Sequence, residues 1–124
     1  MWMIRTALPG LALALSLALQ AQAGPANVLD VQIDHEDGDN YTVTATIRHA
    51  DEGWDHYADK FEVLGPDGAL LGLRTLMHPH VNEQPFTRSL DGVRIPADVT
   101  RITIRAHDSN HGYGGAEIDI DVPR

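Results

Sequence analysis

Short stretches in which apolar and polar residues alternate constrain the fold of this chain most. From Tyr41 to His49 the even-spaced positions are apolar up to the closing histidine, and the positions between them are three threonines and an arginine. From Arg101 to Asp108, Ile102, Ile104 and Ala106 fall on one face. A period of two residues is typical of a half-buried β-strand. Beyond residue 23, no window of useful length shows the 3.6-residue period of a helix.

Further stretches of the same kind predict the remaining strands, at Val28–Asp34, Tyr57–Leu64, Ala69–Leu76, Phe86–Leu90 and Ala116–Val122. Gly65–Gly68, with Pro66 at its second position, predicts a turn that returns the chain antiparallel. Pro96 rules out a central strand within Asp91–Thr100, which we therefore expect to cross between sheets. This spacing predicts an all-β fold, an immunoglobulin-like antiparallel β-sandwich of about seven strands. Its expected core contains Val43, Ala45, Ile47, Ile102, Ile104, Ala106, Ile118 and Ile120.

The first 23 residues have the pattern of a secretory signal peptide. Arg5 precedes an apolar run from Ala7 to Leu19, and Ala21–Ala23 supplies small residues at the cleavage site. The run is shorter than the about 18 apolar residues that a membrane span needs. We therefore expect a signal peptide at 1–23, a single β-sandwich domain at 24–124, and a periplasmic or secreted protein.

Composition narrows the chemistry and the partners. The chain has no cysteine, so it offers neither a disulfide nor a thiolate, and we expect no lipid anchor on a cysteine. A metal site here must use imidazole, carboxylate, thioether or backbone oxygen ligands. The formal net charge of −9 at pH 7 repels nucleic acid and anionic membranes. We expect no nucleic-acid partner and, after signal cleavage, no membrane partner.

The histidines are predicted to gather at one end of the sandwich. If successive strands alternate in direction, the loops at 50–56, 77–85 and 109–115 share one end. Six of the seven histidines lie in or beside these loops, and only His35 lies at the other end. The six are His49, His56, His78, His80, His107 and His111.

Local spacing indicates which of these side chains are candidate metal ligands. His78 and His80 flank Pro79, so in extended backbone both imidazoles point the same way. By the alternation, Asp108 falls on the buried face of its strand. A buried carboxylate must be paired, hydrogen-bonded or metal-bound. The candidate ligands are His49, His56, His78, His80, Asp108 and His111, and the candidate ions are copper, zinc and iron.

Other interpretations of the same residues stay open. Asp108 is also suited to accepting hydrogen bonds from loop amides, and His49 to a hydrogen-bonded position at the end of the core. His107 has outward parity and would lie opposite Glu117 in the simplest hairpin. The acidic run at 34–40 lacks the ligand pattern of a calcium loop and predicts a solvated turn. No nucleophile elbow, phosphate loop or dinucleotide fingerprint is present.

Two segments resemble motifs of the superoxide reductase (desulfoferrodoxin) iron domain, an immunoglobulin-like sandwich. His49-Ala-Asp-Glu-Gly-Trp-Asp-His56-Tyr57 resembles its His-Pro-Met-x-x-x-His-Tyr segment with one additional residue. Asp108-Ser-Asn-His111-Gly112 resembles its Cys-x-x-His-Gly loop, with Asp in place of the cysteine. The resemblance implies His49, His56 and His111 as ligands, with His78 or His80 as a stand-in for a fourth histidine.

The missing cysteine argues against the reductase activity, because in that family the thiolate tunes the iron. The sulfur-carrier-binding subunits of thiosulfate oxidation have a comparable periplasmic sandwich. The chain also resembles uncharacterised small exported proteobacterial proteins, which implies no function.

Two functions from different classes follow from the sequence. The leading hypothesis is binding of a transition metal at the His-rich end, as a carrier, buffer or sensor. The alternative is a non-catalytic periplasmic module that uses the same loops to bind a protein. An enzyme with a mononuclear histidine site is a third hypothesis. The expected partner is accordingly a metal ion or a periplasmic protein.

Overall fold

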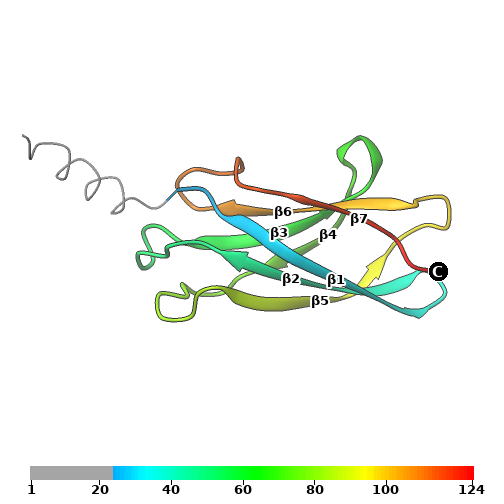
Figure 1. Cartoon of the computed structure of the whole chain (residues 1–124), viewed down its shortest axis with the longest axis horizontal. Coiled ribbons are helices and arrows are strands. Elements are labelled where there is room, and N and C mark those ends of the chain that lie inside the picture. The colour runs from blue at the N-terminus through cyan, green and yellow to red at the C-terminus, as the bar shows by residue number, and fades with distance from the viewer. Residues whose placement is uncertain (1–23) are drawn as a thin grey trace, which may run out of the picture.

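The computed structural model describes residues 24–124, and the signal peptide expected at 1–23 lies outside this range. Within it the chain forms two antiparallel sheets, of three strands in the order β1-β2-β5 and of four in the order β4-β3-β6-β7 (Figure 1). This confirms the predicted seven-stranded β-sandwich. The strands are β1 (Asn27–Asp37), β2 (Asn40–Arg48), β3 (Ala58–Leu64), β4 (Leu70–Thr75), β5 (Phe86–Arg94), β6 (Arg101–Asp108) and β7 (Ile118–Asp121), with a short 3-10 turn, η1 (Pro66–Gly68).

The core lies between the inner faces of the two sheets, where the predicted alternation is observed. The inward residues of β2 and β6 are all buried, and Phe61 and Val63 of β3 join them. Ile118 and Ile120 pack against this core but are only partly buried. The reason is that β7 is the edge strand of its sheet, so only one neighbour covers it.

The segment from Asp91 departs from the prediction of a crossing segment. Strand β5 continues to Arg94, and its pairing with β2 shifts register between Tyr41 and Val43. The shift is accommodated by Gly92, whose φ of 66° suits the extra residue of a bulge. Pro96 follows the end of the strand, where it disturbs no ladder.

The three His-bearing loops lie at the same end of the sandwich, as predicted (Figure 1). They also contact one another. The amide of His49 donates to Gln84 Oε1 at 2.9 Å, which joins the first loop to the second. The amide of Ser109 donates to the carbonyl of Tyr57 at 2.9 Å, which joins the third loop to the first. The end of the sandwich is therefore a connected structure.

The beginning of β1 supports the third of these loops. The amide of Val28 donates to the carbonyl of Ala116 at 2.9 Å. Gly115 lies so close to this segment that an added Cβ would be 1.8 Å from the carbonyl oxygen of Ala26. Glycine is therefore required here for the close approach.

No helix in residues 24–124 is long and apolar enough to cross a membrane.

Replacing a core residue should destabilise the fold far more than replacing an exposed apolar one. We expect Ile104→Ala to lower the free energy of unfolding by about 2–5 kcal/mol, because Ile104 is fully buried and the change leaves a cavity. Leu70→Ala, on an exposed residue of β4, should change it by about 0.5 kcal/mol or less. Urea denaturation measures both, and equal losses would contradict the assignment of the core.

Candidate metal centre

The carboxyl group of Asp108 is fully buried at the end of β6. Its Oδ1 accepts the amides of Asn110 at 2.6 Å and His111 at 2.8 Å. The backbones of Asp108 and Gly112 exchange two further hydrogen bonds of 2.9 Å, which close the turn. Oδ1 is thus committed to the turn, and Oδ2 remains to face other groups.

Three imidazole nitrogens surround Asp108 Oδ2. The Nε2 atoms of His49 and His56 are both within hydrogen-bond distance, the second at 2.8 Å, and His111 Nδ1 is 3.2 Å away. His56 Nε2 is also 3.2 Å from His111 Nδ1. Atoms of His49, His56 and Asp108 that can bind a metal all lie within 4.8 Å of one another. We call His49, His56, Asp108 and His111 the four-residue cluster.

The cluster is assembled from segments far apart in the sequence. His49 follows the last residue of β2, His56 lies in the loop before β3, and Asp108 and His111 lie at the end of β6 and in the turn beyond it. Strands β3 and β6 are paired neighbours, with Ala58 opposite Asp108. The strand pairing therefore holds the first loop beside the Asp108 turn.

A second layer of carboxylates orients the two buried imidazoles. Asp51 Oδ1 lies 2.5 Å from His49 Nδ1 and accepts the amide of Ala58 at 3.1 Å, and Asp51 Oδ2 accepts the amide of His80 at 2.6 Å. Glu52 Oε1 lies 2.5 Å from His56 Nδ1. A carboxylate that accepts Nδ1–H fixes the ring and turns Nε2 toward the centre, as behind many metal-bound histidines.

Electrostatics inside the cluster favour a charged carboxylate. Burial raises the pKa of Asp108, but the amides of His111 and Asn110 and the imidazoles of His111 and His56 outweigh it. The resulting pKa is well below the usual range. The hydrogen bond to Glu52 raises the pKa of His56, burial lowers it, and Asp108 raises it further, so the net shift is upward. The cluster therefore holds an anion at its centre and attracts positive charge.

Access to the cluster is one-sided. The side chains of His49 and Asp108 have no exposed surface and that of His56 is 8% exposed, whereas that of His111 is 45% exposed. Solvent and solutes therefore reach the cluster from the side of His111. A hollow at the same end of the sandwich is lined by Arg48, His49, Ala50, Asp51, Val81 and Gln84.

The other two predicted ligands lie outside the cluster. His78 is exposed, with Nδ1 3.0 Å from the carbonyl oxygen of Pro79. His80 is buried and stacks on Phe86, with ring centroids 4.0 Å apart. Its backbone is bonded to residues beside the cluster, since the amide donates to Asp51 and the carbonyl accepts from Gln84.

Two residues of the second layer were not among the candidates from the sequence. Asp51 and Glu52 lie in the loop between His49 and His56. Acidic residues between two candidate ligand histidines are a signal for such a layer, but the sequence does not show which ring each carboxylate contacts.

The outer face of β3 and β6 anchors the loop that carries His111. The guanidinium of Arg105 lies 3.7 Å from the ring centroid of Tyr113, and His107 makes an edge contact with the same ring. His107 Nδ1 is 2.6 Å from Asp59 of β3, so the expected pairing of His107 with Glu117 is not observed. The reason is the register, in which Ile104 pairs with Ile118 and the β6–β7 ladder ends there.

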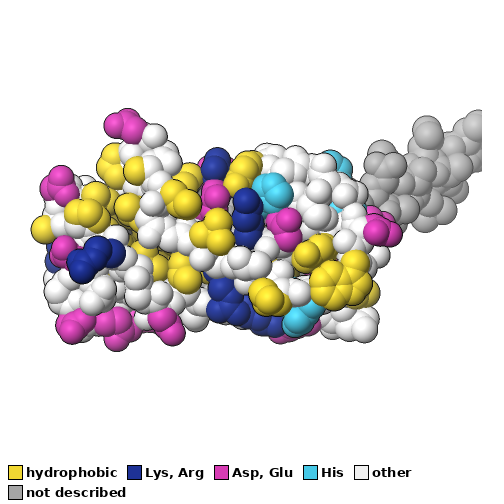
Figure 2. Space-filling view, turned by 180° about the vertical axis from the view of Figure 1, so that it is seen from behind, with side chains coloured by type: hydrophobic (Ala, Val, Ile, Leu, Met, Phe, Trp, Pro, Cys, Tyr) yellow, Lys and Arg dark blue, Asp and Glu magenta, His cyan; other side chains and the backbone are white. Residues whose placement is uncertain are grey.

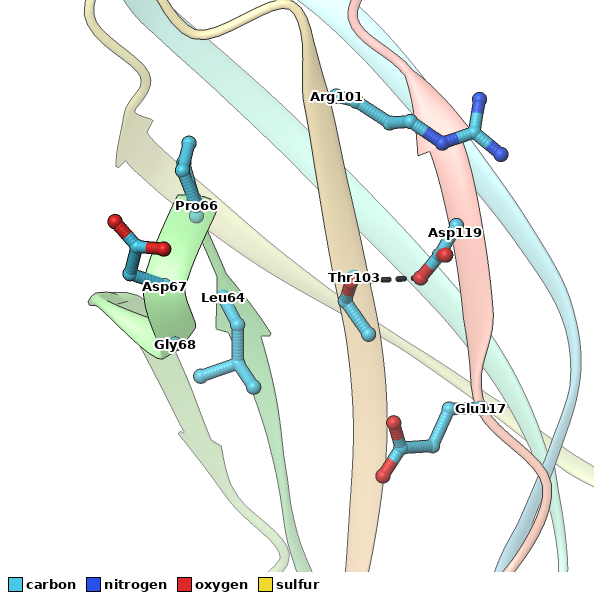
Figure 3. A pocket seen from close by; sticks show the side chains of 9 residues that line it. Leu64, Pro66, Asp67, Gly68, Arg101, Thr103, Glu117 and Asp119 are labelled. Atoms are coloured by element: carbon cyan, nitrogen blue, oxygen red, sulfur yellow. Dashed lines mark hydrogen bonds between the residues drawn. The ribbon is translucent and has the colours of Figure 1, made fainter.

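A hollow away from the histidines lies between η1 and the outer surface of β6 and β7 (Figure 3). It carries the carboxylates of Asp67, Glu117 and Asp119, and Arg101 lies at its edge. The hydroxyl of Thr103 donates to Asp119 at 2.7 Å. Its acidic side chains are solvated and do not converge on a common point, so it is not the candidate centre.

Comparisons with known proteins give a partial sequence match and two structural likenesses. No family model matches the chain. A protein of Halomicrobium mukohataei named "Putative lipoprotein" is 40% identical over 97 residues, which are 78% of this chain and 47% of the relative. The chain thus spans about half the length of the curated relative that it matches.

Among solved structures, the crystal structure of a hypothetical protein from Pyrococcus horikoshii OT3 has a TM-score of 0.50 at 13% identity, covering 86% of this chain and 99% of that one. The crystal structure of superoxide reductase in the oxidized state has a TM-score of 0.47 at 12% identity, covering 80% and 89%. At this identity the first of these likenesses shows a shared fold and nothing more.

The raised pKa of His56 predicts a pH dependence in the metal-free protein. A folded-state pKa above the ordinary value of 6.5 contributes stability that is complete below pH 6.5 and disappears as pH rises through the folded pKa. We expect the stability advantage of wild type over His56→Gln to be largest below pH 6.5 and to shrink at higher pH. Urea denaturation with a chelator present measures it. An advantage that grows with pH would contradict the assignment.

Proposed function

We propose that the protein binds a transition-metal ion through His49, His56, His111 and Asp108. The observation that carries the proposal is the convergence of three imidazole nitrogens on one buried carboxylate oxygen. The carboxylates behind two of the three rings support it, since ligand histidines need such partners.

The number of protons required supports a cation at the centre. Without one, both ring nitrogens of His49 face carboxylate oxygens, and a hydrogen bond in each of these two contacts requires a proton. The same holds for His56, between Glu52 and Asp108. With a metal ion both rings are neutral, donate only through Nδ1, and direct the lone pair of Nε2 inward. An ion at the centre would replace the inner proton of each contact and offset the negative charge of Asp108.

The distances within the cluster are close to those around a small ion. Ligands about 2.0 Å from a tetrahedral metal are about 3.3 Å from one another. His111 Nδ1 is 3.2 Å from both His56 Nε2 and Asp108 Oδ2. The contacts of Asp108 with His49 and His56 are shorter, as in hydrogen bonds, and these groups need to move apart by only a fraction of an ångström.

The donor set restricts which ions are bound. Imidazole nitrogen suits zinc, copper, iron and nickel, whereas magnesium and calcium prefer sites built from oxygen alone. Three nitrogens and one oxygen therefore favour zinc, copper, iron or nickel over magnesium and calcium. A carrier, buffer or sensor fits this geometry, because the partly exposed His111 gives the ion a way in and out.

The protein acts outside the cytoplasm in this proposal. The relative from Halomicrobium mukohataei is named a lipoprotein, which supports export. The signal-like sequence at 1–23 supports it as well. Periplasmic or secreted location, and cleavage before Gly24, are parts of the same proposal.

Zinc titration tests the cluster directly. We expect one Zn²⁺ per chain above pH 7, with binding weakening below about pH 6 as the ligand imidazoles take up protons. Zinc at a hundredfold excess over Kd should stabilise the fold by about 2.7 kcal/mol and raise Tm by several degrees. Calorimetric titration and thermal unfolding measure the two effects.

The matched variants are His111→Ala and His35→Ala, since both histidines are exposed and only the first belongs to the cluster. His111→Ala should weaken zinc binding by about tenfold or more, which corresponds to 1.4 kcal/mol or more. His35→Ala should bind as wild type does. The proposal is wrong if zinc raises Tm equally in all three proteins or in none, and the second result would favour the protein-interaction module.

The oxygen ligand predicts an outcome for superoxide as well. Because Asp108 supplies a hard carboxylate oxygen where the resembling family has a thiolate, iron-loaded protein should not reduce superoxide at the rates typical of that family. Pulse radiolysis measures this rate. Rapid, stoichiometric consumption by the iron-loaded protein would refute the prediction.

A further inference from the structure

The side chain of His80 lacks hydrogen-bond partners although it is buried. It is 5% exposed, and neither Nδ1 nor Nε2 has a partner among residues 24–124. Asp51 Oδ2 lies 3.9 Å from Nδ1, beyond hydrogen-bond distance. Buried polar groups of native proteins almost always have a partner, so a buried imidazole with none is free to bind a water molecule or an ion.

The ring of His80 is held in a fixed orientation. It stacks on Phe86, with centroids 4.0 Å apart and planes 9° apart, and its backbone amide is bonded to Asp51. Burial lowers the pKa of His80, and the positive charge of Arg88 lowers it further. The stacking and the hydrogen bond of the amide therefore fix where the two ring nitrogens lie.

His78 offers a second nitrogen beside this ring. The centroids of the two imidazoles are 4.8 Å apart. His78 Nδ1 donates to the carbonyl oxygen of Pro79 at 3.0 Å, which leaves Nε2 with its lone pair free. Because His78 is exposed, its ring can reorient toward an ion without disturbing the core.

Met77 precedes His78 and adds a different kind of ligand. Met77 is 73% exposed as a residue, so its thioether is available from solvent. On the face that Figure 2 shows, the visible histidines (cyan) lie toward one end of the molecule, with hydrophobic side chains beside them. Thioether sulfur together with imidazole is a donor set for the soft ion Cu(I).

We propose that Met77, His78 and His80 form a second metal site, which binds Cu(I). The site is separate from the four-residue cluster, because His80 reaches it only through its backbone, whose amide donates to Asp51 and whose carbonyl accepts from Gln84. The two sites also differ in donors, since the cluster has a hard carboxylate oxygen and this one a soft sulfur. Each can therefore exist without the other.

Anaerobic Cu(I) titration against a chromophoric chelator tests the second site. The proteins are first given one equivalent of zinc to fill the cluster. We expect wild type to take one Cu(I) from the chelator and the double variant Met77→Leu/His78→Ala to take none. His35→Ala, which removes an exposed histidine at the other end, should behave as wild type does. Equal Cu(I) uptake by the double variant would overturn the proposal.

His80→Phe is the complementary variant, because a second flat ring preserves the stacking on Phe86 and the fold. It should lose Cu(I) and retain the zinc site. Redox-inert Ag(I), added to protein labelled at methionine methyl groups, should shift the Met77 resonance in wild type. An unshifted Met77 methyl, or full Cu(I) uptake by His80→Phe, would refute the site. If wild type binds Cu(I) but no zinc, only the proposal of a metal at the four-residue cluster is refuted.

Discussion

The end of the sandwich depends on one buried carboxyl group. Asp108 ends a core strand with its side chain directed inward, where a charged group is costly unless every lone pair is used. One oxygen accepts two amides of the following turn, and the other faces three imidazoles. The same side chain thus shapes the loop of His111 and supplies the negative charge around which the histidines gather. Without it the rings would have no common partner.

The sandwich provides the rigidity that this arrangement requires. Antiparallel strands return to the same end, so loops distant in sequence meet there, and the pairing of β3 with β6 fixes their register. Asp51 links further segments to the cluster, because it contacts the His49 ring and accepts hydrogen bonds from the amides of Ala58 and His80. The three loops are therefore held by hydrogen bonds to one another as well as by the strands beneath them. A preorganised site of this kind loses little entropy when an ion binds.

Much of this arrangement is predictable from the sequence. Alternation in Tyr41–His49 and Arg101–Asp108 is enough to place the core and to direct Asp108 inward, and strand direction alone brings the loops together. The sequence does not predict which of the six candidate ligands come together, because this depends on the directions of side chains within loops. His78 and His80 share a spacing typical of ligand pairs, yet in the structure one is exposed and the other stacks on Phe86. The continuation of β5 through the bulge at Gly92 is not predicted, because Pro96 argues against a central strand in Asp91–Thr100.

Anomalous X-ray diffraction from crystals grown with zinc tests the central claim most directly. The account predicts a zinc peak about 2.0–2.2 Å from the Nε2 atoms of His49 and His56, from His111 Nδ1 and from Asp108 Oδ2. It also predicts that Asp51 and Glu52 keep their hydrogen bonds to the outer nitrogens of the two buried rings. A zinc peak elsewhere on the molecule, with the contacts among the four side chains unchanged, would contradict the account.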